Sequence, residues 1–88
     1  MDCLGVLDSG NYAYNLCNIL EKKGYVFEVV SMPCKISKGN CSYCLKFPEE
    51  YMSLVISEAE KAKLFIREVY RIIPMNSKNK YELIYSDR

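Results

Sequence analysis

Three cysteines lie close together in this chain, at Cys34, Cys41 and Cys44. A cysteine thiolate is both a strong nucleophile and a soft metal ligand, so this segment is where we expect chemistry to occur. The sequence contains no histidine. A hydrolytic nucleophile that needs an imidazole base is therefore excluded. The chemistry of this protein must concern what its sulfur atoms carry, bind or exchange.

Cys41 and Cys44 form a Cys-x-x-Cys pair, which is typical of a redox dithiol or of half a zinc site. The alternation of Tyr43, Leu45 and Phe47 with other residues predicts a strand that starts at this pair. Two thiols at this spacing in one strand point to opposite faces and lie too far apart for a disulfide. A disulfide is expected only if Cys41 still belongs to the loop. Cys44 is interpreted as an exposed strand residue without a chemical role.

A metal site built on thiolates is an alternative function for the same residues. Cys34, Cys41 and Cys44 supply three thiolates, and Asp8, a water or a second subunit would supply the fourth ligand. No cofactor is expected, because the sequence has neither a phosphate-binding glycine loop nor a cofactor fingerprint.

The other residues predict a scaffold around the cysteine segment. Alternating apolar residues indicate strands, and apolar residues at helical spacing indicate two helices. The expected elements, in chain order, are a strand over Cys3 to Leu7, a helix that Gly24 ends, a strand over Tyr25 to Ser31, the strand after Cys41, a helix that Pro48 begins, and a strand over Phe65 to Ile73 that Pro74 ends.

This order predicts an α+β fold of the ferredoxin-like kind, βαββαβ, in which two helices cover one face of a four-stranded antiparallel sheet. The strand order expected for this fold is 4-1-3-2. We assign residues 1–74 to this single domain and residues 75–88 to a polar C-terminal tail. Within the tail, the alternation over Tyr81 to Tyr85 predicts a short extra edge strand, paired in this molecule or with a neighbour.

The expected topology places the cysteine segment beside the first helix. The third strand starts at the sheet edge where the first strand ends, so Cys41 should approach the turn of Ser9, Gly10 and Asn11. Backbone amides at a helix start stabilise an anion and lower the pKa of a nearby cysteine. Gly39 supplies the backbone freedom that the loop needs. An ordinary helix cap is the alternative interpretation of Ser9.

Composition limits the partners that this chain can have. The 88 residues carry a net charge of +1 without a basic patch, which argues against nucleic acid as a partner. No apolar run is long enough to span a membrane, and the first residues do not resemble a secretory signal, so a cytoplasmic location is expected. The odd number of cysteines fits a reducing compartment. Cys3 and Cys17 are spaced like core residues.

The residues around the cysteines also carry a resemblance to a known family. The run Val29 to Pro33, followed by Ile36, Ser37, Gly39, Cys41 and an apolar strand to Phe47, resembles the signature of small selenium/sulfur carrier-like proteins. The resemblance covers about residues 3–73. It departs from the family where the family has Cys-Gly, because this chain has Cys41-Ser42 there, and Cys34 and Cys44 are additions to the motif.

The resemblance implies that Cys41 is a carrier thiol. A persulfide or perselenide on Cys41 would be held as an anion by backbone amides and released to an acceptor. The partners would be a sulfur or selenium donor protein, such as a cysteine desulfurase, and an acceptor protein. The residues assigned to the supporting loop are Pro33, Cys34, Ile36, Ser37, Gly39 and Cys44.

We therefore predict a thiol carrier or accessory protein in sulfur or selenium handling. A dedicated enzyme is the least expected class, because the chain offers a nucleophile but no general base. Two alternatives stay open besides the carrier: the thiolate metal-binding module, and a non-catalytic interaction domain. The latter would form a homodimer through its sheet face or through the segment from Tyr81 to Tyr85.

Overall fold

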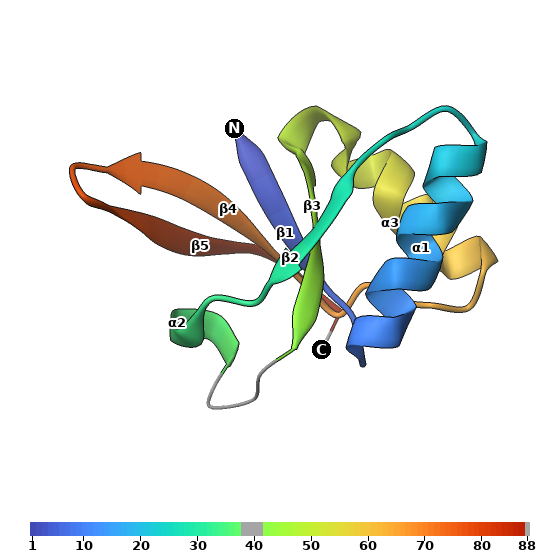
Figure 1. Cartoon of the computed structure of the whole chain (residues 1–88), viewed down its shortest axis with the longest axis horizontal. Helices are drawn as coiled ribbons and strands as arrows, with labels where there is room; N and C mark the ends of the chain where they lie inside the picture. The colour runs from blue at the N-terminus through green and yellow to red at the C-terminus, as the bar shows by residue number, and fades with distance from the viewer. Residues whose placement is uncertain (38–41, 88) are drawn as a thin grey trace.

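The protein folds into one antiparallel β-sheet with its two long helices packed on one side (Figure 1). The computed structural model describes residues 1–37 and 42–87, and of Cys34 it describes the backbone only. Over this part of the chain, no helix combines the length and the apolar character needed to cross a membrane. The elements are, in chain order, β1 (Asp2–Val6), α1 (Gly10–Lys22), β2 (Glu28–Ser31), α2 (Cys34–Ser37), β3 (Tyr43–Pro48), the 3-10 turn η1 (Glu49–Tyr51), α3 (Met52–Lys61), β4 (Glu68–Met75) and β5 (Lys78–Ser86).

Helix α1 begins and ends at residues whose chemistry favours helix ends. The Ser9 hydroxyl accepts a hydrogen bond from the Tyr12 N–H at 3.3 Å, which makes Ser9 the N-cap. After the helix, Gly24 adopts a φ of +94°, a conformation that glycine reaches without strain. Leu16 and Leu20 lie on the fully buried face between these ends. The predicted first helix and its glycine stop are confirmed.

The second long helix begins later than the sequence predicts. Pro48 is the last residue of β3 rather than the first residue of a helix, because its ψ of 142° keeps the chain extended, and η1 then precedes α3. The buried face of α3 contains Val55 and Ala59, together with the charged residue Glu58. The ammonium of Lys23 bonds the Glu58 carboxylate at 2.5 Å, and this hydrogen bond lowers the pKa of Glu58.

The four strands expected from the sequence are present and follow the expected order, β2-β3-β1-β4. Neighbouring strands are antiparallel, and Cys3 of β1 lies opposite Phe47 of β3 on one side and Arg71 of β4 on the other. The expectation of a four-stranded sheet is wrong, because a fifth strand, β5, pairs with β4. The predicted edge strand at residues 81–85 therefore lies in this molecule, and it is longer than expected.

Pro74 does not end β4, which continues through Met75. Pro74 pairs with Asn79 of β5, whereas the pairing of β1 with β4 extends only to Arg71. The proline thus lies where β4 has a neighbour on one side only, and its missing N–H interrupts no ladder of hydrogen bonds. Beyond this point β4 and β5 form a hairpin that stands out from the rest of the protein (Figure 1).

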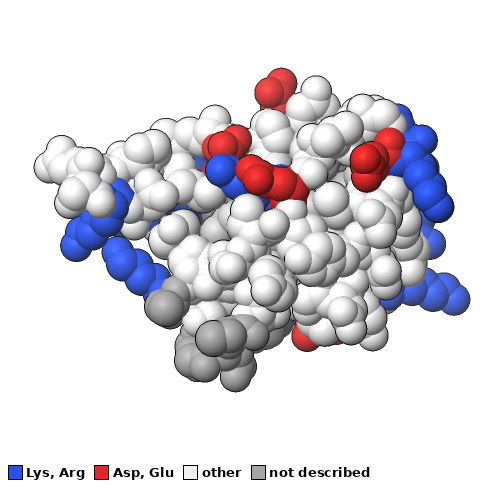
Figure 2. Space-filling view, in the orientation of Figure 1, with Lys and Arg blue, Asp and Glu red and all other residues white. Residues whose placement is uncertain are grey.

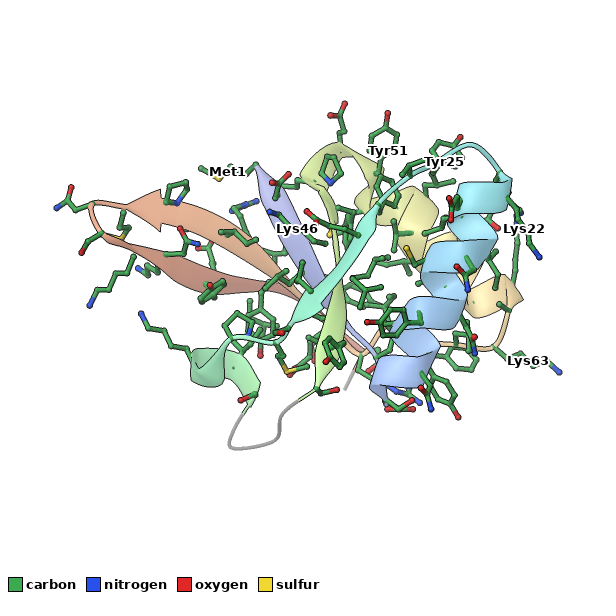
Figure 3. The ribbon with its side chains drawn as sticks, in the orientation of Figure 1. Met1, Lys22, Tyr25, Lys46, Tyr51 and Lys63 are labelled. Carbon is green, nitrogen blue, oxygen red and sulfur yellow. The ribbon has the colours of Figure 1, made fainter. Side chains whose placement is uncertain are left out.

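The main hydrophobic core lies between the sheet and the two long helices, and it has an aromatic end. Around Phe27, the rings of Tyr25, Phe47 and Tyr51 lie with their centroids 5.6 to 6.4 Å away. Figure 3 shows Tyr25 and Tyr51 close together, and their rings meet edge to face. Strand β2 begins only at Glu28 rather than at Tyr25, and Tyr25 and Phe27 before it pack into this aromatic end. The buried members of the main core are Cys3, Leu7, Ala13, Leu16, Leu20, Leu45, Phe47, Val55, Ala59, Ile66 and Val69.

The sheet face away from α1 and α3 is also covered. Strand alternation turns Leu4 and Cys44 to this face, where they are 2% and 0% exposed and lie outside the main core. The short helix α2 lies on this side of the strands (Figure 1), and the Lys35 ammonium contacts the Asn79 carbonyl oxygen at 3.5 Å. Lys35 follows β2 at one sheet edge, and Asn79 belongs to β5 at the other. The segment that contains α2 therefore reaches across this face.

Candidate functional site

The chain between β2 and β3, here named the cysteine loop, contains Cys34 and Cys41, and a backbone hydrogen bond between Met32 and Ser42 closes its neck. The Met32 N–H donates to the carbonyl oxygen of Ser42 at 2.9 Å, which extends the pairing of β2 with β3. Just beyond the neck, the Pro33 carbonyl accepts hydrogen bonds from the N–H groups of Ile36 and Ser37, at 3.1 and 3.0 Å. These two bonds form the single turn of α2. The sequence predicts a loop without a helix here, and the expectation of only two helices is therefore wrong.

Part of the predicted site lies outside the described residues. Cys41, which is the predicted carrier thiol, and Gly39 belong to the segment 38–41, and the side chain of Cys34 is likewise not described. The roles of these residues stay predictions. The described residues fix the two ends of the segment, with Ser37 at the end of α2 and Ser42 immediately before β3.

The start of β3 lies against the first turn of α1. A Cβ atom at Gly10 would lie 3.2 Å from Cδ2 of Tyr43 and 3.6 Å from the Tyr43 backbone nitrogen. The Tyr43 ring also packs on Tyr14 of α1, with the ring centroids 5.7 Å apart. The chain thus enters β3 beside the opening of α1, one residue after Ser42.

The turn before α1 is held by its own hydrogen bonds and by an arginine. Ser9 is the helix cap, and the two oxygens of the Asp8 carboxylate accept hydrogen bonds from the Arg67 guanidinium, both at 3.0 Å. Asp8, which was expected as a possible fourth metal ligand, is therefore engaged with Arg67. Gly10 and Asn11 belong to the first helical turn, where backbone N–H groups have no acceptor within the helix. Their anion-stabilising role stays a prediction.

Cys44 is buried, and the interpretation of Cys44 as an exposed strand residue is wrong. Its side chain is 0% exposed, and its Sγ lies 3.8 Å from the carbonyl oxygen of Val30 on the neighbouring strand. Burial raises the pKa of this thiol to about 11. Cys44 therefore stays protonated at neutral pH, which makes it a poor nucleophile.

Cys3 and Cys17 are also unsuited to thiolate chemistry. Cys3 is fully buried in the main core, as its spacing predicts. Cys17 is partly buried, packs against the same core and donates a hydrogen bond to the carbonyl oxygen of Phe27 at 3.4 Å. Desolvation raises the pKa of both thiols. These cysteines act as small apolar residues.

The described residues contain no cluster of three or more cysteine, aspartate or glutamate side chains that could hold a metal ion. Of the set Cys34, Cys41 and Cys44, the described part of the chain places only the Cys44 thiol, which is directed to the Val30 carbonyl. Among the described residues, therefore, no group of ligands supports the thiolate metal site.

Two arginines on β4 and its approach were missed by sequence reasoning. Besides Asp8, Arg67 binds the Asp87 carboxylate at 2.9 Å. Arg71 binds Glu49 and Glu82, at 2.6 and 2.7 Å. Arg67 ties the residue after β5 to the turn before α1, and Arg71 ties β5 to η1. No local signal in the sequence reveals these pairs, because the partners are distant along the chain.

A hollow of about 230 Å³ lies at the loop neck, and the described residues that line it are Ser31, Met32, Ser42 and Tyr43. The hollow has mixed polar and apolar walls and lies where β2 ends and β3 begins. Over the face shown in Figure 2, Lys and Arg lie mainly at the two ends of the molecule, and the middle is largely uncharged. Lys46 lies near the middle of the same view in Figure 3, between Asp2 and Glu28 at 3.9 and 3.7 Å.

These features define a small α+β domain in which a segment that contains Cys34 and Cys41 connects two neighbouring antiparallel strands. Residues 2–71 match the family described as "Putative Se/S carrier protein-like". The match covers most of the 88 residues, and the chain belongs to this family. Neither a curated protein nor a solved structure matches the chain.

Proposed function

We propose that this protein carries sulfur or selenium as a persulfide or perselenide on Cys41, on a scaffold of the ferredoxin-like kind. The observation that supports a loop cysteine is the environment of the other thiols. Burial raises the pKa of Cys3, Cys17 and Cys44. A thiol that accepts sulfur must be ionised and accessible to its partner. These three cysteines meet neither requirement well, and the two remaining cysteines, Cys34 and Cys41, both belong to the loop segment.

The family motif favours Cys41 over Cys34 as the carrier. Cys41 occupies the motif's cysteine position, whereas Cys34 is an addition to it. Cys41 also directly precedes Ser42 and Tyr43, and Tyr43 lies against the opening of α1. The start of a helix stabilises an anion, so we expect the pKa of Cys41 to be lower than that of a free cysteine.

The proposed transfer needs neither an oxidant nor a reductant. The Cys41 thiolate attacks the terminal sulfur of a donor persulfide, a new S–S bond forms, and the donor's S–S bond breaks. The donor leaves as a thiolate, and the terminal sulfur remains on Cys41. Release to an acceptor thiolate repeats the same exchange. A donor such as a cysteine desulfurase and an acceptor protein are the partners, and a reducing compartment such as the cytoplasm suits a free carrier thiol.

Loading with sulfur followed by intact-mass measurement tests this proposal. The protein is incubated with a cysteine desulfurase and cysteine, and an adduct with the mass of one sulfur atom is expected on the wild-type chain. The adduct should disappear in Cys41→Ser and persist in the matched variants Cys34→Ser and Cys44→Ser. A parallel incubation with a selenium donor compares the two elements on the same thiol.

Two results would contradict the proposal. The first is an adduct that forms equally on Cys41→Ser, since the sulfur would then reside on another cysteine. The second is a stoichiometric zinc or copper content in protein purified without chelators, lost in Cys41→Ser, because the loop would then be a metal site. The rate of Cys41 alkylation against pH, with the other cysteines replaced, gives the thiol pKa directly.

A further inference from the structure

Strand β5 forms one edge of the sheet along its full length of nine residues. Its partner β4 is paired with β1 only as far as Arg71, so the outer part of the β4–β5 hairpin extends beyond the rest of the sheet. Figure 1 shows this hairpin projecting away from α1 and α3. A long edge strand offers unpaired backbone groups to a further strand.

The geometry of the hairpin shows which residues of β5 offer those groups. Met75 and Lys78 are paired across a two-residue turn, and such a closing pair exchanges hydrogen bonds within the hairpin. Backbone groups alternate along a strand, so Asn79, Tyr81 and Leu83 direct their N–H and C=O groups away from β4. The contact of the Asn79 carbonyl oxygen with the Lys35 ammonium, at 3.5 Å, is consistent with this direction.

We propose that β5 pairs with β5 of a second copy of this chain, antiparallel and centred on Tyr81, so that the two five-stranded sheets join into one. In this register Tyr81 lies opposite Tyr81, and Lys80 of each copy lies opposite Glu82 of the other. Lys80 and Glu82 occupy the same face of β5, two positions apart, and each dimer therefore contains two attractive cross-strand charge pairs. Glu82 is 49% exposed despite its bond to Arg71, so it has room for a second cation.

The other registers with the same facing are less favourable. Centring on Lys80 sets Lys80 opposite Lys80, centring on Glu82 sets Glu82 opposite Glu82, and centring on Asn79 sets Lys78 opposite Lys80, so each of them places like charges directly across from each other. Centring on Leu83 brings the irregularity of β5 into the interface. There Tyr70 pairs with Leu83 and Val69 with Tyr85, which leaves Ile84 as an extra residue.

The proposed register also satisfies the backbone and covers exposed apolar surface. The outward backbone groups of Asn79 in one copy form hydrogen bonds with those of Leu83 in the other copy. The outward backbone groups of Tyr81 form hydrogen bonds with those of Tyr81 in the other copy. The Leu83 side chain, 50% exposed in the single chain, comes to lie beside the partner strand. Pairing replaces the contact of Asn79 with Lys35, and the position of α2 is thereby linked to assembly.

A charge-swap experiment tests both the interface and its register. The wild-type chain should show twice the monomer mass in light scattering or native mass spectrometry at high concentration. The variants Lys80→Glu and Glu82→Lys each set like charges opposite each other in their own dimers, and each should weaken self-association by at least about tenfold. An equimolar mixture of the two variants sets opposite charges across both positions, and it should restore a dimer that contains one copy of each.

Two outcomes would overturn the proposal. A wild-type chain that stays monomeric at the highest soluble concentration overturns the proposal. A wild-type dimer whose variants show no recovery on mixing also overturns it, because the charges would then not face each other. Circular dichroism and urea unfolding of each variant show whether it is folded, and Glu28→Lys, on the opposite edge strand β2, is the matched control that should leave the dimer intact.

Discussion

Tyr43 at the start of β3 packs directly on Gly10 at the start of α1, where a Cβ atom would lie 3.2 Å from the tyrosine ring. The contact joins the opening of the first helix to the strand that follows the cysteine loop. Position 10 must stay small for the chain to enter β3 at this place. The packing of one glycine thus sets how closely the loop end approaches the helix.

We expect Gly10→Val to disturb this contact. The branched side chain cannot fit between α1 and Tyr43 without moving the ring or the strand, and overpacking of this kind costs about 1–3 kcal/mol of the free energy of unfolding. Urea denaturation measures the loss. Asn11→Val is the matched control, because Asn11 is exposed in the same helical turn. An equal loss in both variants would show that helix propensity, and not the contact with Tyr43, decides the effect.

Cys44 predicts a decline of stability at alkaline pH. Its pKa is raised from 9.0 to about 11 by burial, so the unfolded chain ionises this thiol before the folded chain does. Ionisation of this thiol has no effect on stability below pH 9. Above that pH, the free energy of unfolding falls by about 2 kcal/mol as the pH approaches the pKa of the thiol in the folded chain.

The matching measurement compares wild type with Cys44→Ala in urea unfolding at several pH values between 8 and about 11. Cys3, Cys17 and the tyrosines are common to both proteins, so the difference between the curves isolates Cys44. The variant should lose less stability than wild type over this range. Parallel curves would mean that the Cys44 thiol is not buried.

The sequence was sufficient for the strands and helices that make the main core. The helical spacing of Leu16 and Leu20 and the stop at Gly24 are local signals, and the structure confirms them. The order of the first four strands follows from the sequence of elements. Cys44 shows where such reasoning stops. Alternation gives the face on which the thiol lies, but it does not reveal that this face is covered.

The full length of the C-terminal strand and the arginine pairs escaped prediction for related reasons. Pro74 is a usual strand end, yet here it lies where β4 has a single neighbour. The start of β5 is polar and shows little apolar alternation. Backbone pairing with β4, rather than buried side chains, holds this part of the strand. The partners of Arg71 are 22 and 11 positions away in the chain. The central residues of the candidate site, Gly39 and Cys41, lie outside the described residues, so their prediction stands as made.

Arg71 predicts a specific response to acid. Its hydrogen bonds lower the pKa of Glu49 below 4.5, so the ion pair stabilises the fold above that pH, and the stabilisation is lost as the pH falls through the lowered pKa. Arg71→Met should therefore be less stable than wild type at pH 7, with a shallower loss of stability on acidification. Thermal unfolding between pH 7 and about 3 measures both. Lys46→Met is the control, since its partners lie 3.7 and 3.9 Å away, and its curve should stay near that of wild type.

Two adjacent residues of β5 should differ sharply in their effect on stability. The irregularity in the pairing of β4 with β5 turns Ile84 and Tyr85 toward the main core, whereas Leu83 is 50% exposed. Ile84→Ala should lower the free energy of unfolding by about 1–2 kcal/mol, because it leaves a partly filled space in the core. Leu83→Ala should change it by less than about 0.5 kcal/mol when measured at low concentration, where any dimer has dissociated. A large loss of stability in Leu83→Ala with none in Ile84→Ala would show that Leu83, and not Ile84, faces the core. The expected result would show that the strand beyond the family match, which ends at residue 71, is an integral part of the fold.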